Sequence, residues 1–127
     1  MSKLADYDVM AMVAVKNLEA SKEFYGETLG LTAGKEMPGV ATFVSGKSVL
    51  VVYEAPSAGS AQSTCASWNV EDIAATVEEL KSKGIKFEHY DMPQTSWEGD
   101  VASWGEQAKA AWFKDPDGNI LGLNENK

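Results

Sequence analysis

The sequence predicts an α+β fold made of two copies of one βαβββ unit, and three observations support this prediction. Two segments of similar sequence begin at Met10 and Cys65, 55 positions apart. In each, a short apolar strand leads into an amphipathic helix that ends at a glycine. Each copy then closes with two strands joined by a turn. Internal repeats guide architecture, because each repeat is one supersecondary unit.

The first copy begins with an apolar strand that leads into a capped helix. Asn17 is a favourable N-cap, since its side-chain oxygen can accept a hydrogen bond from a free backbone N–H group. Apolar and polar residues alternate at helical spacing as far as Gly30, which can adopt the left-handed conformation that ends a helix. A short strand is expected near 32–36. Residues 40–53 predict two strands around a tight turn at 45–46.

The helix of the second copy has the clearer pattern. Asp72 is its expected N-cap, and Gly84 its expected end. Between them, apolar side chains recur at i, i+4 and i+7, at Ile73, Val77 and Leu80. This spacing predicts a helix with one buried face.

The second copy ends in a hairpin with strong turn residues. A short strand is expected near 85–90, and residues 110–123 predict two strands around Asp-Pro-Asp-Gly-Asn at 115–119. Proline presets φ, and glycine and asparagine tolerate positive φ, so this sequence favours a turn.

An insertion distinguishes the second copy from the first. Gly46 and Gly118 lie 72 positions apart, against 55 for the earlier segments, so the second copy contains seventeen extra residues. They lie within 91–108, which carries Trp97 and Trp104 among glycine and polar residues. Long loops in compact domains are usually functional, so a binding loop or lid is expected here.

The length is that of one domain, 1–127, within which the repeat defines two modules. Module one is expected at 1–56 and module two at 64–127, with a polar linker at 57–63.

Composition excludes several classes of protein. The lone Cys65 rules out an intrachain disulfide, and the lone His89 rules out a two-histidine metal site. A net charge of −8 disfavours nucleic acid and anionic membranes as partners. The apolar run 9–15 is too short to span a bilayer. Because the sequence shows no pattern typical of an export signal, a cytoplasmic protein is expected.

The order of motifs resembles the vicinal oxygen chelate superfamily, which includes glyoxalases, bleomycin-resistance proteins and extradiol dioxygenases. The motifs are Val15-x-Asn17-Leu18, Phe24-Tyr25, Leu29-Gly30-Leu31, Val70-x-Asp72-Ile73 and Phe113-x-Asp115-Pro116-Asp117-Gly118-Asn119. This resemblance implies two βαβββ modules whose curved mixed sheets form a U-shaped cavity, and it implies a homodimer.

The resemblance also implies four positions at which metal-using members place their ligands. Here these positions fall on Met10, Leu50, Cys65 and Gly122. A divalent ion needs three or four converging donor atoms, and only the Cys65 thiol could supply one. We therefore expect no metal, no cofactor and no catalytic residue of the metal-dependent kind.

Strand alternation then predicts a binding pocket for a small organic ligand, apolar with a few polar groups. The expected ligand-binding residues are Met10, Met12, Thr42, Leu50, Val52, Cys65, Ser67, Trp97, Trp104, Trp112 and Gly122. Alternative roles stay open for several of them. Trp112 suits pocket and core equally, Trp97 and Trp104 could anchor the loop or fill a dimer interface, and Cys65 and His89 suit structural roles.

The leading functional hypothesis is a metal-free protein that sequesters an aromatic or amphiphilic ligand, cations included, in the manner of bleomycin-resistance proteins. One alternative is a lyase, isomerase or dioxygenase-type enzyme using the same cavity, which bound metal or turnover would reveal. Another is a domain that binds a protein through its acidic surface, with Trp97 and Trp104 filling the cleft.

Overall fold

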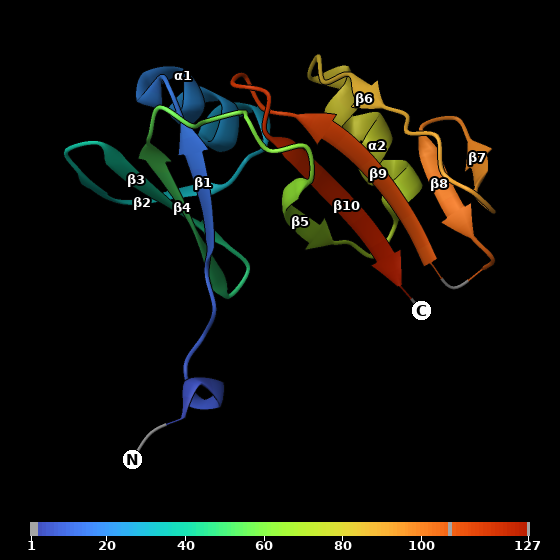
Figure 1. Cartoon of the computed structure of the whole chain (residues 1–127), viewed down its shortest axis with the longest axis horizontal. Coiled ribbons are helices and arrows are strands. Elements are labelled where there is room, and N and C mark those ends of the chain that lie inside the picture. The colour runs from blue at the N-terminus through green and yellow to red at the C-terminus, as the bar shows by residue number, and fades with distance from the viewer. Residues whose placement is uncertain (1–2, 107, 127) are drawn as a thin grey trace. The chain divides into compact units, whose positions relative to one another are not determined.

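The computed structural model describes residues 3–106 and 108–126, and for residue 126 it describes the backbone alone. The chain divides into two compact units between Ala58 and Gly59 (Figure 1). Each unit contains one mixed sheet and the helices packed on it. The predicted α+β fold class is confirmed.

The first unit is a complete βαβββ module. Its elements are η1 (Leu4–Asp6), β1 (Ala11–Val15), α1 (Leu18–Lys22), η2 (Glu23–Thr28), β2 (Thr32–Met37), β3 (Val40–Ser45) and β4 (Ser48–Glu54). The sheet has the order β1-β4-β3-β2; β1 runs parallel to β4, and the other pairs are antiparallel. The predicted turn joins β3 to β4, and its Gly46 has a φ of +57°.

The predicted first helix is divided into an α-helical and a π-helical part. The side chain of Asn17 accepts a hydrogen bond from the Ala20 N–H at 3.1 Å, as a cap should. The chain then widens into the π-helix η2, in which the Tyr25 ring is fully buried and packs 6.1 Å from that of Phe43. Gly30, with a φ of +79°, follows the helix as predicted.

The second unit has two more strands than the first. Its elements are β5 (Thr64–Asn69), α2 (Ile73–Ser82), β6 (Phe87–Glu88), β7 (Ser96–Glu98), β8 (Val101–Trp104), β9 (Ala108–Lys114) and β10 (Ile120–Asn126). The sheet has the order β5-β10-β9-β8-β7, and β6 also pairs with β9. Strand β5 runs parallel to β10, and the remaining pairs are antiparallel.

The insertion at 91–108 contains a β-hairpin at 96–104, so the expectation of a loop or lid was wrong for that half of it. Strands β7 and β8 pair around a turn in which Gly99 has a φ of +60°. Polar and apolar residues alternate before this glycine, in Ser96-Trp97-Glu98, and a glycine turn between two such short segments is typical of a hairpin. The insertion therefore extends the sheet.

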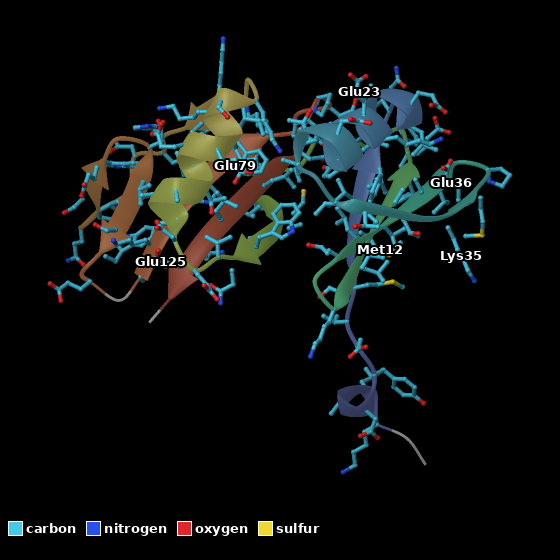
Figure 2. The ribbon with its side chains drawn as sticks, turned by 180° about the vertical axis from the view of Figure 1, so that it is seen from behind. Met12, Glu23, Lys35, Glu36, Glu79 and Glu125 are labelled. Carbon is cyan, nitrogen blue, oxygen red and sulfur yellow. The ribbon has the colours of Figure 1, made fainter. Side chains whose placement is uncertain are left out.

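Helix α2 covers one face of the second sheet, as Figures 1 and 2 show from opposite sides. Its predicted apolar residues Ile73, Val77 and Leu80 are buried. At its start, the Asp72 side chain accepts from the Ala75 N–H at 3.1 Å, and Glu125 of β10 accepts from the Ile73 N–H at 2.9 Å. The last strand thus fixes the helix on the sheet.

The turn at 115–119 is confirmed and tightly bonded. The buried Asp115 carboxylate accepts from the backbone N–H groups of Asp117 and Asn119 at 3.0 and 2.9 Å, and from the Asn119 side chain at 2.8 Å. The Asn119 side-chain oxygen accepts in turn from the Gly59 N–H at 3.1 Å. The start of the second unit is therefore attached to its last turn.

Among the described residues, no helix has the length and apolar character required to cross a membrane.

Candidate functional site

The register of the second sheet decides which side chains share its open face, the face away from α2. Residues paired across neighbouring strands project to the same side. Leu121 pairs with Phe113, and both are fully buried on the face that α2 covers. Gly122, the next residue, pairs with Ser67 on one side and Trp112 on the other, so these three share the open face.

Three tryptophans and a tyrosine form a cluster on this open face, which we call the aromatic cluster: Tyr90, Trp97, Trp104 and Trp112. Trp112 is central, with its ring centroid 5.6 Å from that of Tyr90 and 6.2 Å from those of both Trp97 and Trp104. The contacts are edge-to-face or tilted, which is the geometry aromatic pairs prefer. Trp104 remains 36% exposed.

Small residues beneath the rings make room for the cluster. Ala102 pairs with both Trp97 and Ala110, and both alanines are buried. At Gly122, a Cβ atom would lie only 3.5 Å from Trp112 Cδ1 and 3.4 Å from Ser67 Cβ. A Cβ atom at this position would touch Ser67 and Trp112 at ordinary contact distance, so the Trp112 ring packs directly beside the glycine backbone.

Two polar atoms of the cluster have contrasting surroundings. The Trp104 indole N–H donates to Thr95 Oγ1 at 2.9 Å. The Tyr90 hydroxyl oxygen is buried and has no hydrogen-bond partner among the described residues. Burial raises the pKa of Tyr90 above its ordinary value of 10.0, and the Glu88 carboxylate raises it further. A buried hydroxyl without a partner can hydrogen-bond to a ligand that enters beside it.

A histidine and an aspartate extend the cluster at its edge. The His89 ring stacks on Trp97 with 4.3 Å between centroids and 8° between planes. Its Nε2 atom lies 2.8 Å from Asp100 Oδ1, and Lys81 Nζ lies 3.0 Å from the other carboxylate oxygen. The pKa of Asp100 is lowered, first by the hydrogen bond with His89 and then by that with Lys81. His89 is thereby held in a fixed orientation.

The structure brings five of the predicted binding residues onto one face: Ser67, Trp97, Trp104, Trp112 and Gly122. Sequence reasoning did not include Tyr90 and His89 in the site. Strand alternation was the signal that could have identified Tyr90. Glu88 pairs with Trp112 on the open face, and Tyr90, two residues later, projects to the same face. The expected strand near 85–90 is only two residues long, which weakened the signal.

Cys65 is placed at an irregularity and not among the rings. The pairing of β5 with β10 shifts between Ile120 and Leu121, so that Thr64 and Ala66 have partners and Cys65 is passed over. Its Sγ atom lies 3.9 Å from the Ser63 carbonyl oxygen and 4.0 Å from Asn119 Oδ1. The thiol therefore faces the turn at 115–119.

In the first unit, the prediction that Leu50 and Val52 line a pocket with Met12 is wrong. Leu50 pairs with Ala11 and Val52 with Val13, on the face where Tyr25 packs, and Leu50 and Val52 are 4% and 0% exposed. They belong to the core of the unit.

Met12 instead shares its face with Val51 and Thr42, and Met12 is 54% exposed. The error has a geometric cause. The first hairpin closes on the pair Ser45 and Ser48, and the second on Lys114 and Ile120, so the turns differ in length. Met12 pairs with Val51, and Ser67, which lies 55 positions after Met12, pairs with Gly122, so the counterpart of Gly122 in the first unit is Val51. Met10 lies just before β1 and is 56% exposed.

The corrected positions still do not fit a metal ion. With Val51 in place of Leu50, the four positions carry a thioether, an isopropyl group, a thiol and a glycine. Divalent ions need several converging N, O or thiolate donors, and one thiol does not meet this need. Within residues 3–106 and 108–126, no group of three or more His, Cys, Asp or Glu side chains could hold an ion.

Comparison with solved structures gives the same fold. The antibiotic-binding protein TnmS3 from Streptomyces sp. CB03234 is similar at a TM-score of 0.68 and 22% identity, covering 95% of this chain and 98% of that one. A lactoylglutathione lyase from Agrobacterium tumefaciens has a TM-score of 0.67 and 21% identity, covering 93% and 92%. The integron cassette protein HFX_CASS4, from the mobile metagenome of the Halifax Harbour sewage outfall, has a TM-score of 0.68 and 25% identity, covering 94% of this chain and 99% of that one.

Comparison of the sequence gives the family. No curated protein matches the chain significantly. The family model described as Glyoxalase/Bleomycin resistance protein/Dioxygenase superfamily matches residues 9–123, which is nearly the whole chain. The chain therefore belongs to the glyoxalase/bleomycin resistance protein/dioxygenase superfamily.

Proposed function

We propose that this protein is a metal-free small-molecule-binding protein, whose aromatic cluster binds an aromatic or amphiphilic ligand, cations included. The observation that carries this proposal is the register of the second sheet, which gathers Trp97, Trp104 and Trp112 over alanine and glycine on one face. A surface of ring faces and edges with few charges suits a planar organic molecule.

The interactions that would hold such a ligand can be assigned from the cluster. Apolar area buried against the rings contributes about 25 cal/mol per Å², and each aromatic pair adds about 1 kcal/mol. The Tyr90 hydroxyl would gain the hydrogen bond it lacks. A cation would gain attraction to the ring faces and to the acidic chain, whose net charge is −8.

The donor-poor positions support binding over metal chemistry, and one of the structural relatives is itself a binding protein. TnmS3, which shares the fold, is an antibiotic-binding protein. In this chain the positions that correspond to metal ligands carry Met10, Val51, Cys65 and Gly122. Sequestration needs no ion, whereas the lyase and dioxygenase chemistry of the family does.

One observation favours a second candidate, an enzyme that moves a proton without a metal. His89 is oriented by Asp100 at 2.8 Å and stacks on Trp97, so a base of fixed direction lies beside the aromatic cluster. An oriented imidazole is the usual group for general acid–base catalysis. Turnover that is abolished in His89→Gln, with ligand affinity retained, would establish the enzyme.

Tryptophan fluorescence tests the binding proposal, because the fourth tryptophan supplies a control. Ethidium, a planar cation, is titrated into the wild type and into Trp112→Phe and Trp68→Phe. Trp68 pairs with Leu123 on the face that α2 covers. We expect saturable quenching in the wild type and in Trp68→Phe, and binding at least tenfold weaker in Trp112→Phe. Absence of saturable quenching by ethidium and by neutral or anionic planar dyes would refute the proposal.

We further propose that the chain acts as a homodimer in the cytoplasm. The first sheet leaves Met12, Val44 and Val49 between 39% and 54% exposed on its open face, and large apolar patches of this kind are typical of interfaces. The single free thiol, Cys65, suits a reducing compartment. Sedimentation should give twice the chain mass of 13.7 kDa, and a mass of one chain at micromolar concentration would contradict the dimer.

A further inference from the structure

The first unit contains a cavity on the helix side of its sheet that the proposed function does not use. It has a volume of about 230 Å³ and is lined by residues of α1 and η2 and of strands β2 and β3, together with Leu31. This is room for several waters, at about 30 Å³ each, but less than the usual pocket for a drug-sized ligand. The volume therefore suits a small molecule of a few heavy atoms.

The cavity exists because both of its walls carry small residues. On β2, the helix-facing position next to Phe43 is Ala33, which is too short to reach the helix. On η2, Gly26 lines the cavity, and a Cβ atom there would lie 3.5 Å from Phe43 Cε1. The ring edge of Phe43 therefore borders the space, and Leu31 adds a second apolar wall.

A β-bulge fixes the shape of this edge. The pairing of β2 with β3 is irregular between Ala33 and Glu36. The Thr42 hydroxyl donates to the Lys35 carbonyl at 2.8 Å and holds the bulge in place. At Gly34, a Cβ atom would lie only 2.7 Å from Thr42 Oγ1, so a larger residue here would displace the Thr42 hydroxyl from its hydrogen bond. The sequence thus builds the cavity wall specifically.

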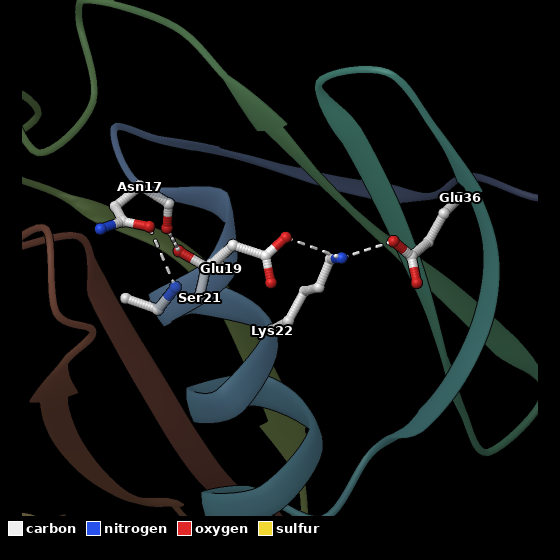
Figure 3. A network of polar contacts seen from close by, with 6 residues as sticks. Asn17, Glu19, Ser21, Lys22 and Glu36 are labelled. Carbon is white, nitrogen blue, oxygen red and sulfur yellow. Dashed lines mark hydrogen bonds and ion pairs between the residues drawn. The ribbon is translucent and has the colours of Figure 1, made fainter.

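Charge at the rim is predominantly negative. Lys22, which lines the cavity, reaches from α1 to β2, with Nζ 2.6 Å from Glu36 and 3.2 Å from Glu19 (Figure 3). These two carboxylates already neutralise the lysine and raise its pKa above 10.5. Glu27 also lines the cavity, and within the described part of the chain it has no ion-pair partner. A carboxylate is therefore available beside an apolar pocket.

We propose that this cavity binds a small alkylammonium ion, with its alkyl chain against Phe43 and Leu31 and its ammonium group beside Glu27. A neutral alcohol of the same shape would keep the apolar contact and lose the charge pair. A carboxylate would meet the negative rim and be repelled. The order of affinity is therefore ammonium, then alcohol, then carboxylate.

Three aliphatic probes test this order without engaging tryptophan stacking: n-butylammonium, n-butanol and butyrate. Each is titrated into uniformly ¹⁵N-labelled protein while backbone amide shifts are recorded, with Gly26 and Gly34 as reporters of the two walls. We expect saturable shifts at both glycines with n-butylammonium at a Kd of about 1–10 mM, as a ligand of five heavy atoms allows. Butanol should bind more weakly, and butyrate should not bind.

Two neighbouring glutamates supply matched variants. Glu27 lines the cavity, whereas Glu23, at the start of the same π-helix, does not. Glu27→Gln should weaken n-butylammonium binding two- to fivefold and leave butanol unchanged, as for a solvent-accessible ion pair. Glu23→Gln should leave both unchanged. Gly26→Leu, which places a side chain in the cavity, should abolish the shifts at Gly34.

Three results would overturn the proposal, and none depends on the aromatic cluster. These are shifts at Gly26 and Gly34 that remain linear to 100 mM, equal affinity for butyrate and n-butylammonium, and equal weakening by Glu27→Gln and Glu23→Gln. If Gly26→Leu fails to fold, the glutamate pair still decides. Failure of ethidium to bind the tryptophans would leave this test unaffected.

Discussion

The two units repeat one topology and present different open faces. Both place a parallel strand pair next to an antiparallel hairpin, with a capped helix on one side. On the open face, the first unit presents alkyl side chains such as Met12, Val44 and Val49. The second presents Trp112 with amide and hydroxyl groups around it.

The hairpin β7–β8, which has no counterpart in the first unit, accounts for much of this difference. It carries two of the three tryptophans, Trp97 and Trp104, and pairs with β9 so that both reach Trp112. An insertion has therefore changed the chemistry of one face without changing the module beneath it. We call the open face of the first unit, with Met12, Val44 and Val49, the alkyl face, and that of the second unit, with the aromatic cluster, the aromatic face. The alkyl face suits a protein contact, and the aromatic face suits a small ligand.

The largest expected difference between the units lies in their last turns. Asp115 is 5% exposed and accepts hydrogen bonds from Asp117 and Asn119 within its turn, whereas Lys47 is exposed in the corresponding turn of the first unit. Asp115→Ala leaves buried N–H groups without acceptors and should lower the free energy of unfolding by about 3 kcal/mol. Lys47→Ala should change it by less than about 0.5 kcal/mol.

Urea unfolding followed by circular dichroism measures both variants of the turns. Equal effects of Asp115→Ala and Lys47→Ala on the free energy of unfolding would contradict the prediction, because they would show that the hydrogen bonds of Asp115 add no stability to its turn.

Sequence patterns predicted the modules because their signals are local. Caps at Asn17 and Asp72 and the turn at 115–119 depend on neighbouring residues, and each was confirmed. The faces of the strands were harder to predict, because register depends on how a hairpin closes. Because the two turns differ in length, the faces of β4 are shifted by one residue relative to the prediction, which therefore assigned Leu50 to the wrong face.

The aromatic cluster could be predicted only in part for a related reason. Trp112 is assigned to a face by its place in a long strand, but Tyr90 follows a strand of two residues. The stacking of His89 on Trp97 joins segments whose proximity depends on the pairing of β6 and β8 with the same strand. No local pattern encodes such a contact.

A charge on the alkyl face tests its proposed role as a dimer contact. Val49 is 39% exposed on this face. If a second copy covers it, Val49→Asp buries an unpaired carboxylate and should raise the dimer dissociation constant at least thirtyfold, which is about 2 kcal/mol. Ser67→Asp, on the open face of the second sheet, is the matched variant and should leave the dimer intact. Sedimentation velocity distinguishes the two, and dissociation by Ser67→Asp alone would reverse the assignment of the faces.

Removing a ring from the inserted hairpin tests the proposed role of the aromatic face. Trp97→Ala deletes one side of the aromatic cluster and should weaken ethidium binding about tenfold, which is about 1.4 kcal/mol. Met12→Ala on the alkyl face should leave the Kd within twofold of the wild type. Calorimetric titration measures both, and it avoids the loss of a fluorophore. A larger effect from Met12→Ala would place the ligand on the alkyl face.

The smallest expected effects are two pH dependences of opposite sign, one in each unit. The pKa of Asp100 is lowered below 3.8 by His89 and then Lys81, so its stabilisation is complete above pH 3.8 and is lost as the pH falls through the lower native value. The pKa of Lys22 is raised above 10.5 by Glu36 and then Glu19. Its stabilisation is complete below pH 10.5 and is lost as the pH rises through the higher native value.

Urea unfolding at a series of pH values should therefore separate the two units. The difference in unfolding free energy between the wild type and Asp100→Asn should be present at about pH 5 and shrink below about pH 4. The difference between the wild type and Glu36→Gln should stay constant from about pH 6 to 9 and shrink only above about pH 10.5. Both ion pairs are partly exposed, so 1 M salt should reduce both differences. If the Asp100→Asn difference instead persisted unchanged to pH 2, the contacts of this carboxylate with His89 and Lys81 would not stabilise the fold, and the edge of the aromatic cluster would be held by packing alone.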